Sequence, residues 1–150
     1  MERVAQCHCG SLRVIAVGEP SFVYLCHCLA CQRRTGAIVH SGCSFPKDRV
    51  RIEGQSKIYE RDAASGRKTR FHFCPNCGSN VFFDGDRDPN SYGITVGSFA
   101  DPKFPRPTFS IFEEAMHPWI EVATVTDRFP QGATRLPTGV APPAAGARSA

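Results

Sequence analysis

This sequence has little of what marks a membrane protein or a nucleic-acid-binding protein. No stretch reaches the roughly 18 uninterrupted apolar residues of a membrane-spanning helix, and the N-terminal MERVAQCHCG has no apolar run after its charges. The formal charge is only +4, with 14 acidic residues among 18 basic ones. The dense basic stripe of a nucleic-acid-binding protein is therefore missing. We expect a cytoplasmic protein with no membrane and no nucleic-acid partner.

Helical periodicity is also scarce. Nowhere do apolar residues recur at i, i+3, i+4 and i+7 over about a dozen positions, as a long amphipathic helix requires. Short segments rich in β-branched and aromatic residues, most of them bounded by turn residues, predict strands instead. They are 11–17, 37–45, 50–53, 57–60, 69–73, 80–83, 92–96 and 108–113. The prediction is a mainly β fold of several small coiled β-sheets, with metal sites adding stability.

A chain of 150 residues suits one domain, since two would each have too small a core. From Pro137 onward the sequence PTGVAPPAAGARSA is Pro, Ala and Gly with almost no bulky side chain. Such a composition cannot bury enough apolar surface to offset the cost of ordering the chain. We therefore expect a zinc-binding domain over 1–136 and a disordered tail over 137–150. The sequence sets no oligomeric state.

Cysteine is the residue type that stands out. Eight cysteines lie at 7, 9, 26, 28, 31, 43, 74 and 77. In a reducing cytosol they would not form disulfides, so metal binding or thiol chemistry is the better interpretation. Seven of the eight fall into clusters, and the eighth, Cys43, lies in the apolar segment HSGCSF, where a free cysteine behaves as a small buried hydrophobe.

Two cysteine pairs each precede a glycine. Cys74 and Cys77 form a C-x-x-C-G turn, in which both thiolates can reach one tetrahedral zinc and the glycine permits a positive φ. A structural zinc takes four ligands, so this pair needs a second pair. Cys7 and Cys9, which are followed by Gly10, supply it. The predicted structural site is therefore Cys7, Cys9, Cys74 and Cys77.

Three further thiols lie within one six-residue segment, at Cys26, Cys28 and Cys31. Three ligands leave one zinc position open, as in catalytic sites. Two alternatives stay open: His27 could close the site, or the trio could be a second scaffold completed by Cys43, a histidine or water. A thioredoxin-type redox pair at Cys28 and Cys31 is disfavoured, because the βαβ pattern that surrounds such pairs is missing.

Arginine follows the trio directly, at positions 33 and 34. A zinc bound by three thiolates has net charge −1, so a nearby cation would help an anionic ligand approach. We predict this role for Arg33, while that of Arg34 stays open. Trp119, the sole tryptophan, is expected to pack in the core, and the alternative is that it covers the pocket.

The order C-x-C-G, C-H-C-x-x-C and F-x-F-C-x-x-C-G resembles the glutathione-dependent formaldehyde-activating family, which is also related to a centromere protein. The likeness extends to Arg33-Arg34-Thr35-Gly36, to residues 97–102 (GSFADP) and to Trp119, and it covers about residues 5–130. It implies an Mss4-like fold in which the outer cysteine pairs bind a structural zinc and the middle trio binds a second one.

The resemblance also implies an activity, the joining of glutathione and formaldehyde to S-hydroxymethylglutathione, which is carbon–sulfur lyase chemistry. The expected partners are glutathione or a similar small thiol and a small aldehyde. The candidate catalytic residues are Cys26, Cys28, Cys31 and Arg33. The alternative hypothesis is a non-catalytic zinc module that binds a thiol or a protein partner.

Overall fold

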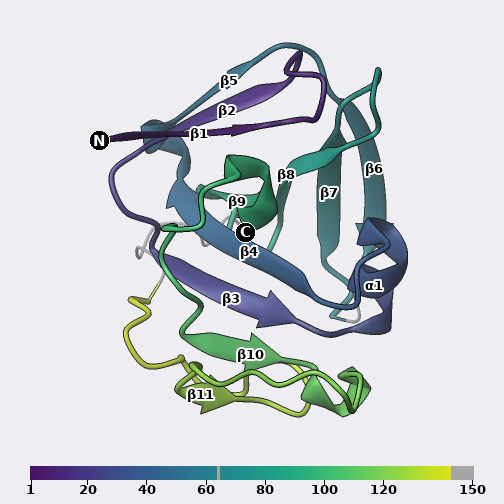
Figure 1. Ribbon diagram of the computed structural model, residues 1–150, viewed down its shortest axis with the longest axis vertical. Coiled ribbons are helices and arrows are strands. Elements are labelled where there is room, and N and C mark those ends of the chain that lie inside the picture. Colours follow the sequence, from purple (N-terminus) through teal and green to yellow (C-terminus); the bar gives the residue numbers. More distant parts are fainter. Residues whose placement is uncertain (64, 143–150) are drawn as a thin grey trace.

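The protein is built almost entirely of short strands (Figure 1). The computed structural model describes residues 1–63 and 65–142. The strands are β1 (Glu2–Gln6), β2 (Arg13–Val17), β3 (Phe22–Cys26), β4 (His40–Pro46), β5 (Val50–Glu53), β6 (Lys57–Asp62), β7 (Lys68–Phe73), β8 (Asn80–Gly85), β9 (Ser91–Thr95), β10 (Phe109–Ile111) and β11 (Asp127–Arg128). The helical segments are α1 (Leu29–Thr35) and the 3₁₀ turns η1 (Lys47–Arg49), η2 (Val96–Phe99) and η3 (Glu113–Ala115). The predicted mainly β fold class is confirmed.

Two sheets hold these strands. The first has the order β1-β2-β5, and the second has the order β11-β10-β3-β4-β9-β8-β7-β6. Figure 1 shows the small sheet lying across one end of the molecule, next to the ends of β7 and β8. Pairing in both sheets is antiparallel, except that β10 pairs in parallel with β3 and β11. No helix of the described residues is long and apolar enough to cross a membrane.

The core lies against one face of the large sheet. Val23, Cys43 and Ile94 stand opposite one another on β3, β4 and β9, and all three are buried. Directly opposed residues of an antiparallel pair project from the same face, so these side chains form one apolar row. Val14 of the small sheet and Leu12, which directly precedes β2, belong to the same buried cluster. Apolar packing therefore joins the two sheets, and the opposite face of β3 and β4 is left for other contacts.

Three strands, β1, β3 and β11, and the helix α1 were not among the predicted elements. Strand β3 (FVYLC) lacks apolar alternation, because its neighbours leave no residue of it exposed. Helix α1 has seven residues, too few for a periodic pattern. It begins after Cys28, whose side chain accepts a hydrogen bond from the Cys31 N–H, and ends at Gly36, which has a φ of 71°.

The C-terminal segment is held by a buried carboxylate. Asp127 accepts a hydrogen bond from the Thr138 amide at 2.7 Å and pairs with Arg135. The hydrogen bond from Thr138, together with the Arg135 contact, lowers the pKa of Asp127 to about 2. Residues 137–142 of the predicted tail are thus described, with Thr138 in contact with the domain, whereas 143–150 lie outside the described residues.

Candidate metal centres

The structure brings Cys7, Cys9, Cys74 and Cys77 together. Their four sulfur atoms all lie within 4.8 Å of one another. Cys7 and Cys9 follow β1, whereas Cys74 and Cys77 lie in the turn between β7 and β8. The cluster therefore joins the small sheet to the large one. We call it the four-cysteine cluster.

The two turns of this cluster share one local geometry. Gly10 and Gly78 have φ values of 80° and 74°, a region that glycine enters at no steric cost. Each glycine amide donates to the carbonyl of the first cysteine of its turn, at 3.0 Å for Gly10 and 2.9 Å for Gly78. A backbone amide also approaches each first sulfur, from Leu12 to Cys7 at 3.2 Å and from Cys77 to Cys74 at 3.5 Å. At Cys7 burial raises the pKa of the thiol and outweighs the Leu12 amide, which favours the thiolate.

Two serine hydroxyls complete the surroundings of the sulfurs, and the sequence analysis missed them. Ser11 Oγ lies 3.1 Å from Cys9 Sγ and 3.3 Å from Cys74 Sγ. Ser79 Oγ lies 3.3 Å from Cys77 Sγ and accepts a hydrogen bond from the His8 amide at 3.1 Å. The available signal was the tripeptide C-G-S, which occurs at residues 9–11 and again at 77–79.

These polar contacts tune the thiols unequally. A hydrogen bond from Asn76, aided by Ser11, lowers the pKa of Cys9 to about 5. Contacts with Ser79 lower the pKa of Cys77 to about 7, whereas burial raises that of Cys7. Because the thiolate is the form that binds metal, Cys9 and Cys77, the more exposed cysteines of the cluster, are closer to the metal-binding form than Cys7 is.

The second cluster consists of Cys26, Cys28 and Cys31, whose sulfurs also lie within 4.8 Å of one another. Cys26 ends β3, Cys28 precedes α1, and Cys31 lies in the first turn of the helix. Hydrogen bonds with Cys26 and Cys31 lower the pKa of Cys28 to about 2, and the pKa of Cys26 is raised through its contact with Cys28. Among the described residues, no fourth His, Cys, Asp or Glu joins this three-cysteine cluster.

The structure directs two of the candidates for a fourth ligand, His27 and Cys43, elsewhere. His27 is fully buried, and its Nε2 lies 3.1 Å from Ser110 Oγ on β10. Cys43 is also fully buried, and its thiol donates to the Ile94 carbonyl at 3.4 Å. Burial raises the pKa of Cys43 to about 12. Cys43 is therefore the small buried hydrophobe that the sequence suggested.

The two arginines of α1 have different surroundings. Arg33 is exposed, whereas Arg34 is half-buried and places its guanidinium 4.2 Å from the centre of the Phe71 ring. Trp119 does not pack in the core as expected, because 67% of its surface is exposed. Trp119 lies on the same loop as His117. A 3.0 Å hydrogen bond between His117 and Gln32 connects this loop to α1.

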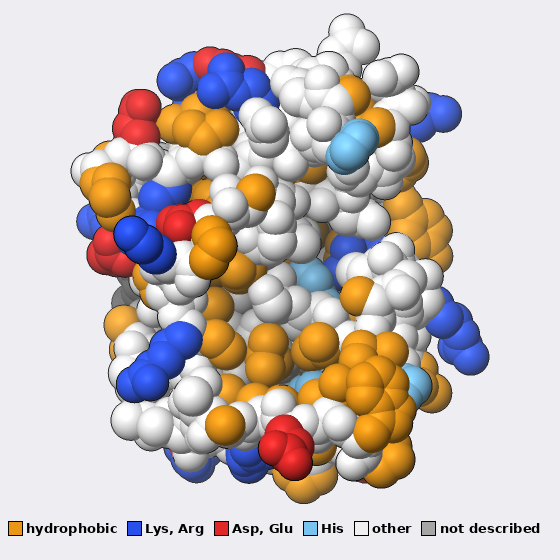
Figure 2. Space-filling model, viewed as in Figure 1, with side chains coloured by type: hydrophobic (Ala, Val, Ile, Leu, Met, Phe, Trp, Pro, Cys, Tyr) orange, Lys and Arg blue, Asp and Glu red, His pale blue; other side chains and the backbone are white. Residues whose placement is uncertain are grey.

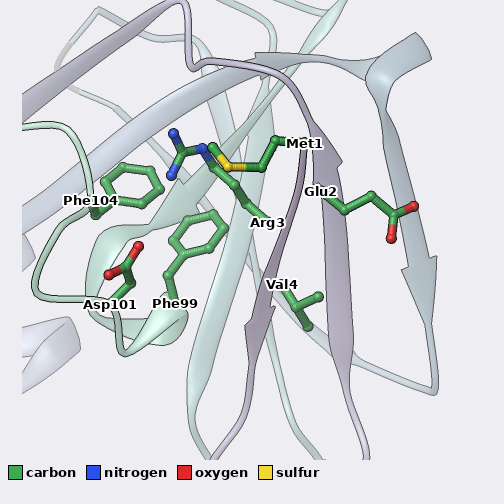
Figure 3. A pocket seen from close by; sticks show the side chains of 7 residues that line it. All are labelled: Met1, Glu2, Arg3, Val4, Phe99, Asp101 and Phe104. Carbon is green, nitrogen blue, oxygen red and sulfur yellow. The ribbon is translucent and has the colours of Figure 1, made fainter.

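A cavity of about 180 Å³ lies away from both clusters (Figure 3). Its lining residues are Met1, Glu2, Arg3, Val4, Phe99, Asp101 and Phe104. The guanidinium of Arg3 stacks on Phe104 at 5.2 Å and pairs with Glu19 at 2.6 Å. Since this charge is already engaged, we assign the cavity no function.

Two of the three positive charges in the basic run at residues 67–70 are paired with acidic neighbours. Arg70 pairs with Asp84 and Asp86, and Lys68 pairs with Glu60 and Asp62. Figure 2 shows acidic and basic side chains interspersed on the visible face, with hydrophobic side chains gathered in its lower half. The ion pairs leave this run as a solvated salt-bridge network rather than a phosphate site.

Comparisons with known proteins agree with these clusters. Among solved structures, the chain is similar to a protein from Rhodobacter sphaeroides, with 23% identity and a TM-score of 0.50 over 63% of this chain and 85% of that one. That likeness bears on the fold alone. No curated protein matches. Residues 2–115 match the family described as "Glutathione-dependent formaldehyde-activating enzyme", a span that contains all eight cysteines. The chain therefore belongs to the glutathione-dependent formaldehyde-activating enzyme family.

Proposed function

We propose that each cluster holds one zinc ion, the four-cysteine cluster as a closed structural site and the three-cysteine cluster as a site with one open position. Four thiolates at tetrahedral spacing are a donor set that zinc takes in structural sites. Sites at which zinc acts on a substrate have three protein ligands. The sulfur separations at both clusters fit these two donor sets.

We further propose that the protein is a carbon–sulfur lyase-type enzyme, resembling S-hydroxymethylglutathione synthase. It would join or cleave a thiol, such as glutathione, and a small aldehyde. The observation that carries this proposal is the three-cysteine cluster, which gathers three thiols from one short segment and has no fourth protein donor among the described residues. Family membership supports the same reaction class.

The reaction needs no outside oxidant or reductant. The thiol sulfur forms a bond to the carbonyl carbon, the C=O π bond breaks, and the thiol proton ends on the oxygen. Zinc at the cluster would supply either polarisation of the carbonyl or stabilisation of the incoming thiolate. Cys28 and Cys31 are held by the first turn of α1, which fixes two of the three ligands relative to each other. Arg33 is proposed to offset the site's negative charge.

The test is the rate of thiol–aldehyde exchange on fully zinc-loaded protein with a panel of thiols and small aldehydes. We expect saturation kinetics with a rate above the spontaneous reaction, and loss of that rate in Cys31→Ser. A matched Cys43→Ala variant, whose thiol lies outside both clusters, is expected to retain it. A zinc-loaded protein that never exceeds the spontaneous rate would contradict the proposal.

The alternative is a zinc module that binds a thiol or protein partner without catalysis. In that case both clusters would be scaffolds, and losing either should damage the fold equally. We also propose a cytoplasmic location, because eight free thiols suit a reducing compartment.

A further inference from the structure

Unpartnered polar atoms gather beside the three-cysteine cluster. Among the described residues, the buried side-chain N and O atoms without a hydrogen-bond partner are His27 Nδ1, Arg34 Nε, His40 Nδ1, His40 Nε2 and Thr95 Oγ1. Buried polar groups in native structures nearly always have a partner, so each such atom calls for an explanation. Four of these five atoms belong to Arg34, His40 and Thr95.

The strand register places His40 and Thr95 on the cluster's side of the sheet. His40 stands directly opposite Cys26, and Gly42, two residues further along β4, stands opposite Thr95. Opposed residues project from the same face, and alternate residues of a strand do so too. His40, Thr95 and Cys26 therefore share one face, and Cys43 with the apolar core lies on the other.

Aromatic rings surround these polar groups. The ring of His40 lies 6.1 Å from that of Tyr24 and 5.8 Å from that of Phe83, both in edge contacts. Arg34 reaches the same region from the last turn of α1, over the ring of Phe71. Phe71 and Phe83 are themselves in contact at 6.0 Å. A weakly polar wall strengthens any charge interaction made inside it.

Arg34 carries a permanent charge, and no carboxylate of the described residues forms an ion pair with it. Among the described residues its one recorded side-chain contact is the Phe71 ring, and its Nε has no acceptor. Desolvating a charge without a partner is costly, and a guanidinium matches the planar shape of a carboxylate. A histidine ring offers at least one N–H donor in either tautomer, and a threonine hydroxyl offers another. The donors of His40 and Thr95 thus lie on the face of the sheet that carries Cys26, and Arg34 is added from the last turn of α1.

We propose that Arg34, His40 and Thr95 form a carboxylate-binding subsite, and that the small thiol or the small aldehyde handled at the three-cysteine cluster carries a carboxylate. This inference rests on the proposed function in that the cluster holds the reacting group. It adds the residues that would hold such a carboxylate, a group that glutathione itself carries, so that the substrate would be held at both its reacting atom and its charge.

Isothermal titration calorimetry on the zinc-loaded protein tests this proposal with two pairs of compounds. Each pair compares an acid with its uncharged counterpart. Thioglycolate is compared with 2-mercaptoethanol, and glyoxylate with glycolaldehyde. The pair that shows the preference identifies which substrate carries the carboxylate. We expect the acid to bind about tenfold more tightly or better, since hydrogen bonds to a charged group contribute on that scale.

The same measurement on variants assigns the preference to residues. Arg34→Gln and His40→Gln should each lose most of it while the affinity for the uncharged compound stays within about twofold. The matched controls are Arg3→Gln, which removes another guanidinium stacked on a phenyl ring, and His72→Gln, which removes another histidine stacked on a phenyl ring, both away from the cluster. These two should keep the full preference. Circular dichroism and zinc content establish that each variant is folded and loaded.

Three other outcomes are distinguishable. Uncharged compounds that bind as well as their acids would overturn the subsite and leave the proposed function standing. If no compound binds through the cluster, formate is titrated while the side-chain NMR signals of Arg34 and His40 are followed. Saturable shifts in wild type that vanish in Arg34→Lys would keep the subsite and sink the proposed function. If formate does not shift these NMR signals, the subsite is overturned, and water is indicated as the partner of these atoms.

Discussion

Two serine hydroxyls lie against the four-cysteine cluster, and the charge of such a site explains why. Four thiolates around Zn²⁺ leave a net charge of −2, which is costly at a partly buried position. Ser11 Oγ lies near three of the four sulfurs, and Ser79 Oγ lies near the fourth. A hydroxyl that donates to a thiolate spreads this charge, as partners around metal ligands commonly do.

Ser11→Ala tests that role. The variant should keep the fold but bind its most tightly held zinc about 10- to 100-fold more weakly, because a donor to the thiolates is removed. Competition with a coloured chelator measures the affinity. Ser56→Ala serves as the control, since its hydroxyl contacts His72 rather than a sulfur. Equal affinities in wild type and Ser11→Ala would show that the hydroxyl is a bystander.

Residue-scale prediction from sequence worked where the chemistry is local. Within each of Cys74–Gly78 and Cys26–Cys31, spacing alone brings the thiols together, and the structure shows them together. Arg34, His40 and Thr95 come from a helix and two strands, and their meeting depends on the β3-β4-β9 register. No spacing in the sequence encodes that register, so the sequence could not predict that these three residues lie together.

At the scale of elements, α1 positions the three-cysteine cluster. The helix is short, so its two ends matter more than its interior. Cys28 caps the first turn through its sulfur, and the amide of Gly36 closes the last turn on the Gln32 carbonyl at 2.8 Å. Thr35 Oγ1 donates to the Cys31 carbonyl at 2.8 Å, which links the end of the helix back to a cysteine of the cluster.

Gly36→Ala should disturb this cluster through the backbone alone. Nothing lies within 4 Å of the added Cβ, but a φ of 71° costs a non-glycine residue about 1 kcal/mol. We expect a loss of that order in urea unfolding and weaker zinc binding at the three-cysteine cluster. Gly97→Ala is the control, since Gly97 has neither a positive φ nor a close neighbour. Identical unfolding curves for Gly36→Ala and Gly97→Ala would contradict the strain argument.

The strands that the sequence predicted best are those bounded by clear turn residues. The segments around β5 to β9 end at Gly, Pro, Asp or Asn, and their predicted ranges overlap the observed ones closely. By contrast, β1 and β11 carry a weaker signal: β1 is a short, mostly polar strand, and β11 has two residues and gains its place by parallel pairing with β10. Long-range pairing of this kind leaves almost no local pattern.

At the scale of the molecule, the two clusters have different mechanical roles. The four-cysteine cluster ties the end of β1 to the β7–β8 turn and so connects the two sheets. The three-cysteine cluster ties β3 to the helix that follows it two residues later, within one local segment. Its loss should therefore free α1 while leaving the joint between the sheets intact.

Cys77→Ser and Cys28→Ser separate these roles. Cys77→Ser should unfold the domain or lower its melting temperature by more than about 10 °C, since a structural zinc contributes folding free energy on the order of 10 kcal/mol. Cys28→Ser should lose one zinc and melt within about 5 °C of wild type. Melting curves and zinc counts on both variants measure this. Equal damage from both would favour the alternative of two scaffolding sites.

The ligands of the two clusters also differ in when they exist during synthesis. Cys26 to Cys31 leave the ribosome almost together, so their binding site needs no later part of the chain. Cys9 must wait for Cys74, 65 residues on, and until then its thiol lacks the two cysteines of the later turn. Metal supply during translation therefore affects the two halves of this protein differently. Early scarcity would leave the first cysteines open to oxidation before the polypeptide that shelters them has been made.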